Sequence, residues 1–335
     1  MKRFLLILAA LALIGAGAAE WAISAWDAPG PAAAKGNETV VLIEPGTSLH
    51  QIAEELGARR VMNYPLLFEL GLRASGQASL VKAGEYAIPS RASMKAIAAI
   101  LVAGKSIQHK LTAAEGLTSQ MVYALVVHEP ALSGDAGPAP AEGTLLPETY
   151  LFTRGTARRK ILDEMERAQR KYLAAQWAHR APGLPFNDMR QALTLASVVE
   201  KETALPEERR HIASVFINRL KAGMPLQSDP TIIYGLTKGY PLGHGIRQSE
   251  LESDTPYNTY RVPGLPRGPI CNPGKDSIAA VLHPESTGDI YFVASGSGGH
   301  VFSDNIATHQ KNVAALRALE RRQKAATRAK APAGR

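Results

Sequence analysis

The sequence predicts an α+β fold in three parts: an N-terminal transmembrane helix, a small βααβ subdomain and a larger α+β domain. Three observations support this. The 335-residue chain opens with an apolar run, and Gly- and Pro-rich stretches separate the later parts. Apolar residues recur with the strand period of two in some segments and with the helix period of about 3.6 in others. A hydrophobic content of 45% suits packed cores and is too low for a multi-span membrane protein.

Residues 4–26 form the apolar run, with Glu20 as the one charged residue in it. About 20 apolar residues are enough for a helix to cross a bilayer. Lys2 and Arg3 precede the run, and positive charge at this end keeps the N-terminus in the cytoplasm. The rest of the chain is therefore expected on the far side of the membrane.

Two tryptophans, Trp21 and Trp26, are expected at the far interface of that membrane. The alternative is a cleaved signal peptide, because residues 16–18 (Ala-Gly-Ala) are small, as at a cleavage site. We favour the uncleaved anchor over residues 1–26. Both readings place the body of the protein outside the cytoplasm.

Residues 27–38 are rich in Pro, Gly and Ala and are predicted to form a linker. The small subdomain follows over residues 39–105. Ser48 is suited to cap its first helix, and Gly104 to end its last. The predicted order is a strand over 39–43, helices after Ser48 and over 65–72, a strand over 84–88 and a helix over 94–102.

Residues 106–316 form the larger domain. A Gly- and Pro-containing loop is expected at 131–143. The other predicted elements are helices near 157–180, 188–203 and 207–222, a strand over 290–294 and a final helix from about residue 308. Residues 317–335, rich in Ala, Lys and Arg, are predicted to fray into solvent.

The net charge of +8 is confined to the two ends of the chain. Lys2 and Arg3 contribute +2 and the tail over residues 317–335 contributes +6, so residues 4–316 are neutral. A nucleic-acid-binding protein places a basic stripe on its folded body. We therefore expect no nucleic-acid partner.

The helix over residues 193–203 presents one carboxyl group on an apolar face. Leu195, Val198 and Val199 share a stripe with Glu202, because positions three and four apart lie on one side of a helix. Glu200 lies about 200° away around the same helix. Desolvation raises a carboxyl pKa, so Glu202 is suited to act as an acid near neutral pH. The alternative is that both glutamates belong to a solvated helix end.

Three later loops combine hydroxyl, amide and aromatic side chains, over residues 224–231, 257–260 and 264–274. Aromatic rings stack on sugar rings and amides bind sugar hydroxyls, so these loops suit a glycan groove. For the tyrosines, the alternative is core packing with the hydroxyl reaching the surface. The candidates for lining the groove are Gln227, Asp229, Tyr257, Asn258 and Tyr260.

We expect no metal and no cofactor. His300 and His309 lack ligand partners at diagnostic spacing. The glycines at 296–299 are not a phosphate loop, because no GKS or GxGxxG pattern accompanies them. Cys271, the single cysteine, is expected to be a small packed thiol.

Seven segments resemble, in order, the endolytic murein transglycosylases of the YceG-like family. The resemblance covers about residues 39–320 together with the anchor. Arg267 departs from it, since the family usually repeats proline there, and is expected to alter loop stiffness or add a groove contact. The segments are EGTLLPETYLF at 142–152, VVEKET at 198–203, VFINRLKAGMPLQSDPTIIYGL at 215–236, TPYNTYR at 255–261, GLPRGPICNPG at 264–274, YFVASGSGGHVFS at 291–303 and ATHQKNV at 307–313.

The resemblance implies a lyase, a lytic transglycosylase with its catalytic domain in the periplasm and its anchor in the cell inner membrane. Such an enzyme cleaves the β-1,4 bond between N-acetylmuramic acid and N-acetylglucosamine within peptidoglycan strands and leaves a 1,6-anhydromuramyl end. The second acidic residue of the family's E-K-E-T motif is catalytic, which falls on Glu202. Glu148, Glu200 and Asp229 are then candidates for orienting groups. The implied partners are peptidoglycan glycan strands and the cell-wall synthesis machinery, where such enzymes terminate nascent strands.

The small subdomain resembles a LysM-like module, which in other proteins binds N-acetylglucosamine; the alternative is a spacer between membrane and catalytic domain. Two other functions remain open. One is a muramidase-type hydrolase, which uses water and releases reducing ends. The other is an anchored, non-catalytic murein-binding scaffold.

Overall fold

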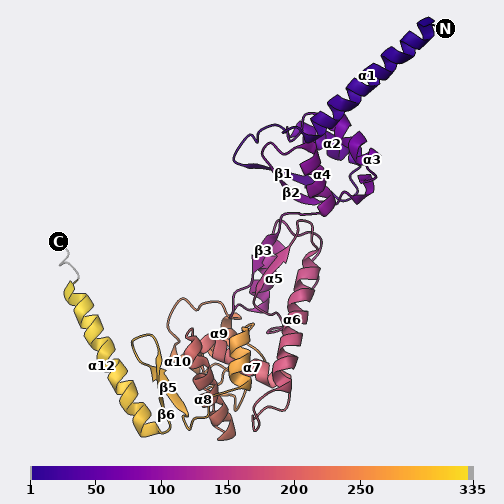
Figure 1. Ribbon diagram of the computed structural model, residues 1–335. Coiled ribbons are helices and arrows are strands. Elements are labelled where there is room, and N and C mark those ends of the chain that lie inside the picture. The colour runs from indigo at the N-terminus through magenta and orange to yellow at the C-terminus, as the bar shows by residue number, and fades with distance from the viewer. Residues whose placement is uncertain (1, 331–335) are drawn as a thin grey trace. The chain divides into compact units, whose positions relative to one another are not determined.

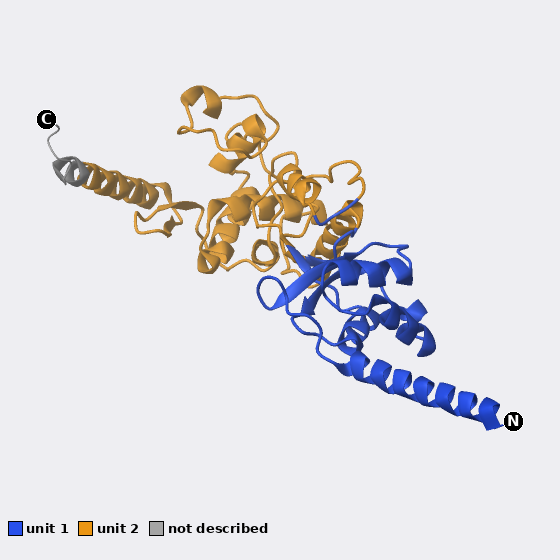
Figure 2. Ribbon diagram, turned by 90° about the horizontal axis from the view of Figure 1, so that it is seen from above, with its two compact units in different colours: residues 1–110, 131–133, 151–156 blue, residues 111–130, 134–150, 157–335 orange. Residues whose placement is uncertain are grey.

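The computed structural model describes residues 2–330 (Figure 1). The chain forms two compact units (Figure 2). Unit 1 holds the residues up to 110 together with the short segments 131–133 and 151–156. Unit 2 holds residues 111–130, 134–150 and 157 onward. Helices and strands are mixed in the chain, as an α+β fold requires.

Unit 1 begins with the apolar helix α1 (Lys2–Asp27), which is predominantly exposed to solvent. Its mean hydropathy of 2.0 and its length make it compatible with a single-pass membrane anchor. The end of α1 packs against the rest of the unit, where the Trp26 ring stacks on Phe68 at a centroid distance of 5.9 Å.

The predicted βααβ order of the small unit is confirmed. Strand β1 (Glu38–Ile43) pairs antiparallel with β2 (Gly84–Pro89). Between them lie α2 (Leu49–Ala58), α3 (Pro65–Ala74) and the 3₁₀ turn η1 (Ala78–Leu80), and α4 (Met94–Ala103) follows β2. Ser48 caps α2 and Gly104 ends α4 in the left-handed conformation, at a φ of 68°. The buried core includes Val41, Leu56, Phe68, Tyr86 and Ile97.

The first part of the large domain contains elements that the sequence analysis did not predict. Strand β3 (His109–Thr112) pairs with β4 (Thr149–Phe152), and α5 (Ser119–His128) lies between them in the chain. Thr118 caps α5 by accepting a hydrogen bond from the Met121 N–H. Strand β3 (HKLT) has one apolar residue and β4 (TYLF) has three in succession, so neither shows the polar–apolar alternation that identifies a strand.

The three predicted long helices are confirmed as α6 (Arg158–Ala178), α7 (Met189–Glu202) and α8 (Arg209–Lys221). Helix α11 (Lys275–Leu282) packs on α7 and α8 and closes the core of unit 2. The 3₁₀ turn η2 (Pro206–Glu208) joins α7 to α8, and the short helices α9 (Asp229–Thr237) and α10 (Gln248–Leu251) follow. The core includes Leu195, Val198, Ile212, Phe216 and Ile278.

The last elements are a hairpin of β5 (Tyr291–Ala294) with β6 (His300–Ser303) and the helix α12 (Ile306–Lys330), which packs on that hairpin. We expected the chain to fray from residue 317. For residues 317–330 this is wrong, because α12 extends to Lys330. Ala, Leu, Arg, Lys and Gln dominate this segment and are the strongest helix formers. Residues 331–335 of the predicted tail lie outside the described residues.

Candidate active site

Helix α7 carries Glu202 to the edge of a cavity. Asp188 begins the helix by accepting a hydrogen bond from the Gln191 N–H. Leu195, Val198 and Val199 are fully buried, so the predicted apolar stripe faces the core of unit 2. Glu202 is the last residue of the helix, where the stripe leaves the core.

The cavity has a volume of about 380 Å³. Its walls come from α7, α8, α9, β5, α12 and the loops that precede α9 and follow α10. Both polar and apolar side chains line it, as in sites that bind a partly apolar ring bearing hydroxyl groups. The lining residues are Glu202, Arg219, Leu226, Gln227, Asp229, Tyr260, Phe292, Val293, His309 and Val313.

The Glu202 carboxyl has an unusual environment. Its Oε2 accepts a hydrogen bond of 2.9 Å from the Ser228 hydroxyl. Burial, together with the charge of nearby Asp229, raises the pKa of Glu202 to about 7, against the opposing effects of Ser228, His300 and Arg219. At neutral pH this carboxyl can therefore both give and take a proton.

The Ser228 side chain donates its hydrogen bond to Glu202 and does not cap its own helix, α9. Ser228 occupies the N-cap position of α9, but its side chain makes no capping hydrogen bond and donates to Glu202. The loop before it is held from Thr259, whose carbonyl accepts from the Gln227 N–H and whose Oγ1 accepts from the Ser228 N–H. Gln227 has a φ of 53°, a left-handed conformation that is costly for a residue with a side chain. This strained, well-anchored turn aims Ser228 at the carboxyl.

Asp229 and Tyr260 form a second polar pair in the cavity. The Tyr260 hydroxyl donates to Asp229 Oδ1 at 2.7 Å. Burial and this hydrogen bond raise the pKa of Tyr260, so the hydroxyl keeps its proton and remains a donor. Asp229 opens α9, where the positive end of the helix dipole favours a carboxylate.

Arg219 and His309 also line the cavity, and the sequence analysis did not select either as a site residue. The Arg219 guanidinium is held by three carbonyls. Its Nε donates to Ile290 at 2.6 Å, and its Nη1 donates to Leu226 at 2.8 Å and to Pro225 at 3.3 Å. The His309 ring stacks on Tyr291, and its Nδ1 is buried with no hydrogen-bond partner among residues 2–330. Both occur in segments that carry the family resemblance, which was the one signal available.

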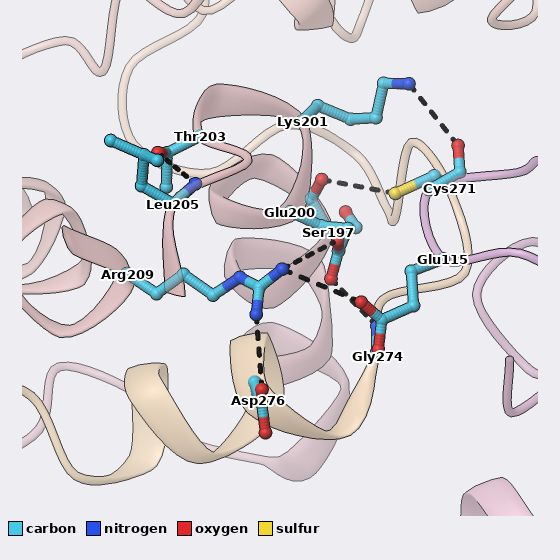
Figure 3. A network of polar contacts seen from close by, with 11 residues as sticks. Glu115, Ser197, Glu200, Lys201, Thr203, Leu205, Arg209, Cys271, Gly274 and Asp276 are labelled. Carbon is cyan, nitrogen blue, oxygen red and sulfur yellow. Dashed lines mark hydrogen bonds and ion pairs between the residues drawn. The ribbon is translucent and has the colours of Figure 1, made fainter. Parts of the chain in front are cut away.

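Glu200 does not line the cavity. It belongs to a separate network of polar contacts (Figure 3). Its Oε2 accepts a hydrogen bond of 2.9 Å from the Gly274 N–H, and its Oε1 lies 3.8 Å from Arg209 Nη2. The Arg209 guanidinium also contacts Glu115 at 3.6 Å and Asp276 at 3.3 Å. Glu200 thus joins α7 to the start of α11 and to α8.

Three other predicted residues are also outside the cavity. Asn258 is fully buried and donates to the Leu251 and Ser253 carbonyls, so it shapes its own turn. Tyr257 packs edge-on against Tyr234, with centroids 4.8 Å apart. Glu148 is exposed and pairs with Lys275 at 2.6 Å. Of the predicted site residues, the structure brings together Glu202, Gln227, Asp229 and Tyr260.

Two further expectations concern single residues. Arg267 lines a separate cavity of about 480 Å³, together with Arg190 and Leu265. Cys271 is fully buried, its thiol donates to the Ser197 carbonyl at 3.3 Å, and burial raises its pKa. The prediction of a packed thiol is confirmed.

Among residues 2–330, no group of three or more His, Cys, Asp or Glu side chains is arranged to hold a metal ion.

Comparisons with known proteins point to one family. The sequence profile of the YceG-like family matches residues 41–315. An endolytic murein transglycosylase of Bacillus subtilis is 38% identical over 173 residues, which are 51% of this chain and 47% of the relative. One from Streptococcus pneumoniae is 38% identical over 180 residues, which are 52% of this chain and 32% of the relative.

These matches span less than half the length of either curated relative. A solved structure, that of a YceG-like protein from Listeria monocytogenes, covers 83% of this chain and 99% of its own. It is 30% identical, with a TM-score of 0.50.

Proposed function

Because the chain belongs to the YceG-like family, we propose that it is an endolytic murein transglycosylase, a lyase that acts on peptidoglycan. In this proposal it cleaves the β-1,4 bond between N-acetylmuramic acid and N-acetylglucosamine within glycan strands and leaves a 1,6-anhydromuramyl end. The observation that carries the proposal is Glu202, a carboxyl with a pKa of about 7 at the wall of a cavity suited to sugar rings.

In the first step Glu202 acts as the acid. Its proton passes to the glycosidic oxygen, and the bond from the muramic C1 to that oxygen breaks with its electron pair moving to the oxygen. The N-acetylglucosamine side leaves with a new 4-hydroxyl group. The charge that develops at C1 is met by the substrate's own N-acetyl oxygen. Arg219, whose positive charge favours ionised Glu202, stabilises the carboxylate left behind.

In the second step the same carboxylate acts as the base. It removes the proton from the muramic O6 hydroxyl, and the oxygen forms a bond to C1. Glu202 is then protonated again, and no water is consumed. A pKa near 7 suits both halves of this cycle, because neither protonation state is rare at neutral pH.

The alternative is a muramidase-type hydrolase. The observation that favours it is a second carboxyl group, Asp229, in the same cavity as Glu202. Glycosidases that use water pair two carboxyl groups, one as acid and one as base or nucleophile. In our proposal Asp229 has a different role. It keeps Tyr260 oriented and raises the pKa of Glu202 through its charge.

The test is a digest of purified glycan strands with the full chain, its Glu202→Gln variant and the matched Glu200→Gln variant. Mass spectrometry of the product ends separates the functions. We expect anhydro ends, lighter by one water than reducing ends, from the native chain and from Glu200→Gln. We expect no cleavage by Glu202→Gln. Reducing ends would support the hydrolase, and equal binding without cleavage by all three proteins would support the non-catalytic scaffold.

The proposal extends to the placement of the protein. Helix α1, with Lys2 and Arg3 before its apolar segment, is proposed to anchor unit 1 in the inner membrane with the catalytic unit in the periplasm. The βααβ order of unit 1 supports a LysM-like role in holding glycan, and termination of nascent strands beside the synthesis machinery is the physiological role that we propose. Protease added to intact spheroplasts should remove the catalytic unit; protection from it would contradict this topology.

A further inference from the structure

Helix α3 of unit 1 carries an apolar face that the fold leaves uncovered. Leu66 is 66% exposed, Leu70 is 51% exposed and Tyr64, at the start of the helix, is 43% exposed. Leu66 and Leu70 lie four residues apart and therefore share one side of the helix. Phe68 and Leu72 point the other way, into the core. The outer face of α3 (Tyr64, Leu66 and Leu70) is thus more than two-fifths exposed at each of its three positions.

Ring contacts fix α3 against the end of α1. Trp21 meets Tyr64 edge to face, with centroids 5.3 Å apart, and Trp26 stacks on Phe68. The Trp26 ring also lies so close to Gly71 that a Cβ there would clash with it. The earlier residue of α1, Trp21, thus contacts Tyr64 at the start of α3, and the later residue, Trp26, contacts Phe68 and Gly71 further along α3. The two helices run in the same direction, and the N-terminal end of α3 lies beside Trp21.

The position of Trp21 along α1 indicates how far α3 lies from the centre of a bilayer that α1 spans. From Phe4 to Trp21 the helix spans 18 residues, or about 27 Å, close to the roughly 30 Å of a bilayer's hydrocarbon core. With that segment in the membrane, Trp21 lies at the interface, and so does Tyr64 in contact with it. Leu66 follows within one helical turn, whereas Leu80 lies beyond the far end of α3, after Ala74.

The charge around this face also matches a membrane surface. Arg60 is exposed four residues before Tyr64, and the first turn of α3 contains no acidic side chain. The N-terminus of α3 adds the positive end of a helix dipole. Glu69, the acidic residue in the middle of α3, is buried and paired with Arg73 and His50. Apolar side chains beside positive charge are typical of segments that lie in the headgroup region of a bilayer.

We propose that the outer face of α3 is a second membrane contact, embedded at the boundary of headgroups and acyl chains in the same bilayer that α1 spans. The inference rests on the membrane-anchoring part of the proposed function. It adds that unit 1 is seated on the lipid surface, with its orientation set by Tyr64, Leu66 and Leu70, and does not swing freely at the end of α1. The catalytic role of Glu202 is not involved.

The test uses the full chain reconstituted in vesicles of phosphatidylethanolamine and phosphatidylglycerol. Single cysteines carrying an environment-sensitive fluorophore are introduced by Leu66→Cys and by the control Leu80→Cys, an exposed leucine of the same unit. Native Cys271 is buried, so the unaltered chain serves as the labelling blank. Lipids with a nitroxide at the headgroup or high on the acyl chain quench fluorophores at that depth. We expect quenching at residue 66 on the order of threefold stronger than at residue 80, with a blue-shifted emission.

Equal, weak quenching at residues 66 and 80 would overturn the proposal. A blue shift at residue 66 without lipid quenching, together with cross-linking between chains, would also overturn it, because a second copy would then cover the face. A Leu11→Cys label tests the anchor itself, and failure of deep-chain nitroxides to quench it would remove the anchor and this inference together. Glycan cleavage by the same samples is measured separately, so the failure of the catalytic proposal is distinguishable from each of these.

Discussion

Two glutamates at the C-terminal end of α7, Glu200 and Glu202, lie in different environments on the two sides of the helix. On one side Glu200 is bound by a backbone N–H and by Arg209, in a network that also includes Glu115 and Asp276 (Figure 3). On the other side Glu202 accepts a hydrogen bond from the neutral Ser228 hydroxyl and lines a cavity. The two residues are separated by one position in the sequence.

One turn of α7 therefore carries a carboxylate that stabilises the packing of helices and a carboxyl that is suited to proton transfer. A carboxylate that accepts a backbone hydrogen bond and pairs with an arginine holds structural elements together. A carboxyl that is buried with one neutral partner has a raised pKa and can exchange its proton. Removing a group from the Glu200 side should therefore reduce stability, and removing one from the Glu202 side should reduce activity.

The largest expected effect is that of Glu202→Gln on glycan cleavage. The amide keeps the shape of the side chain but cannot donate and retake a proton. A general acid contributes roughly 10²–10⁴-fold to a rate, and one residue in both roles should reach the upper part of that range. The measurement is the initial rate of anhydro-end release. Glu200→Gln should retain most of the rate, and an equal loss in the two variants would remove the distinction between the sides.

The next effect is on stability, through Arg209→Met. Arg209 is buried, and its loss leaves Glu200 with no cationic partner in the part of the chain that the structure describes. Removing one member of a buried ion pair costs about 3–5 kcal/mol of the free energy of unfolding. Chemical denaturation of the full chain in detergent measures it. The matched control is Arg210→Met, which removes an exposed arginine that donates to the His283 carbonyl and should cost much less.

The raised pKa of Glu202 also predicts a pH-dependent stability. In the folded protein the carboxyl holds its proton up to a pKa of about 7, against a reference value of 4.5. The folded state is thus favoured at low pH, and this contribution disappears as the pH rises through that window. At 1.36 kcal/mol per pKa unit, the loss is about 3 kcal/mol. Denaturation at several pH values should show it in the native chain and not in Glu202→Gln; parallel curves would contradict the assigned pKa.

A smaller effect is expected from Ser228→Ala. The Ser228 hydrogen bond lowers the Glu202 pKa, so its removal should raise that pKa further. A net hydrogen bond of about 1 kcal/mol corresponds to less than one pKa unit. The high-pH limb of the activity profile should move to higher pH by that amount. Ser214→Ala, which removes a serine bonded to Thr287, should leave the limb in place.

The smallest effect is expected at the exposed pair of Glu148 with Lys275. Both side chains are close to half exposed. Such pairs contribute about 0–1 kcal/mol, and Lys275→Ala should change the free energy of unfolding by no more than that. Activity should also be unchanged, since Glu148 lies outside the cavity. A marked rise in KM for glycan would show that Glu148 contacts substrate after all.

Periodicity predicted the element that carries the chemistry. The stripe of Leu195, Val198 and Val199 points into the core, and Glu202 continues it to the cavity wall. The network around the neighbouring Glu200 was not predictable in this way. Its backbone donor Gly274, and Glu115 and Asp276, which share Arg209 with it, are each more than 70 positions from Glu200 in the chain. Only the packing of α7 on α8 and α11 brings them together.

In the loops, side-chain chemistry alone does not show which polar groups are free to meet a ligand. Asn258 has the right amide for a sugar hydroxyl, but both of its N–H groups are used by carbonyls of its own turn. Ser228 was an unremarked loop residue, yet it reaches Glu202 because the strained Gln227 turn aims it there. Which polar groups of a loop remain free is decided by backbone hydrogen bonding, and the sequence does not encode that in any local pattern.

In the proposed reaction, Glu202 catalyses an intramolecular transfer in which no water takes part. Cleavage of glycan strands in water enriched in heavy oxygen tests this most directly, because a hydrolase must place solvent oxygen on the new muramic end. We expect anhydro ends, lighter by one water and free of the label, that are lost in Glu202→Gln. Labelled reducing ends that depend on Glu202 and Asp229 together would contradict it.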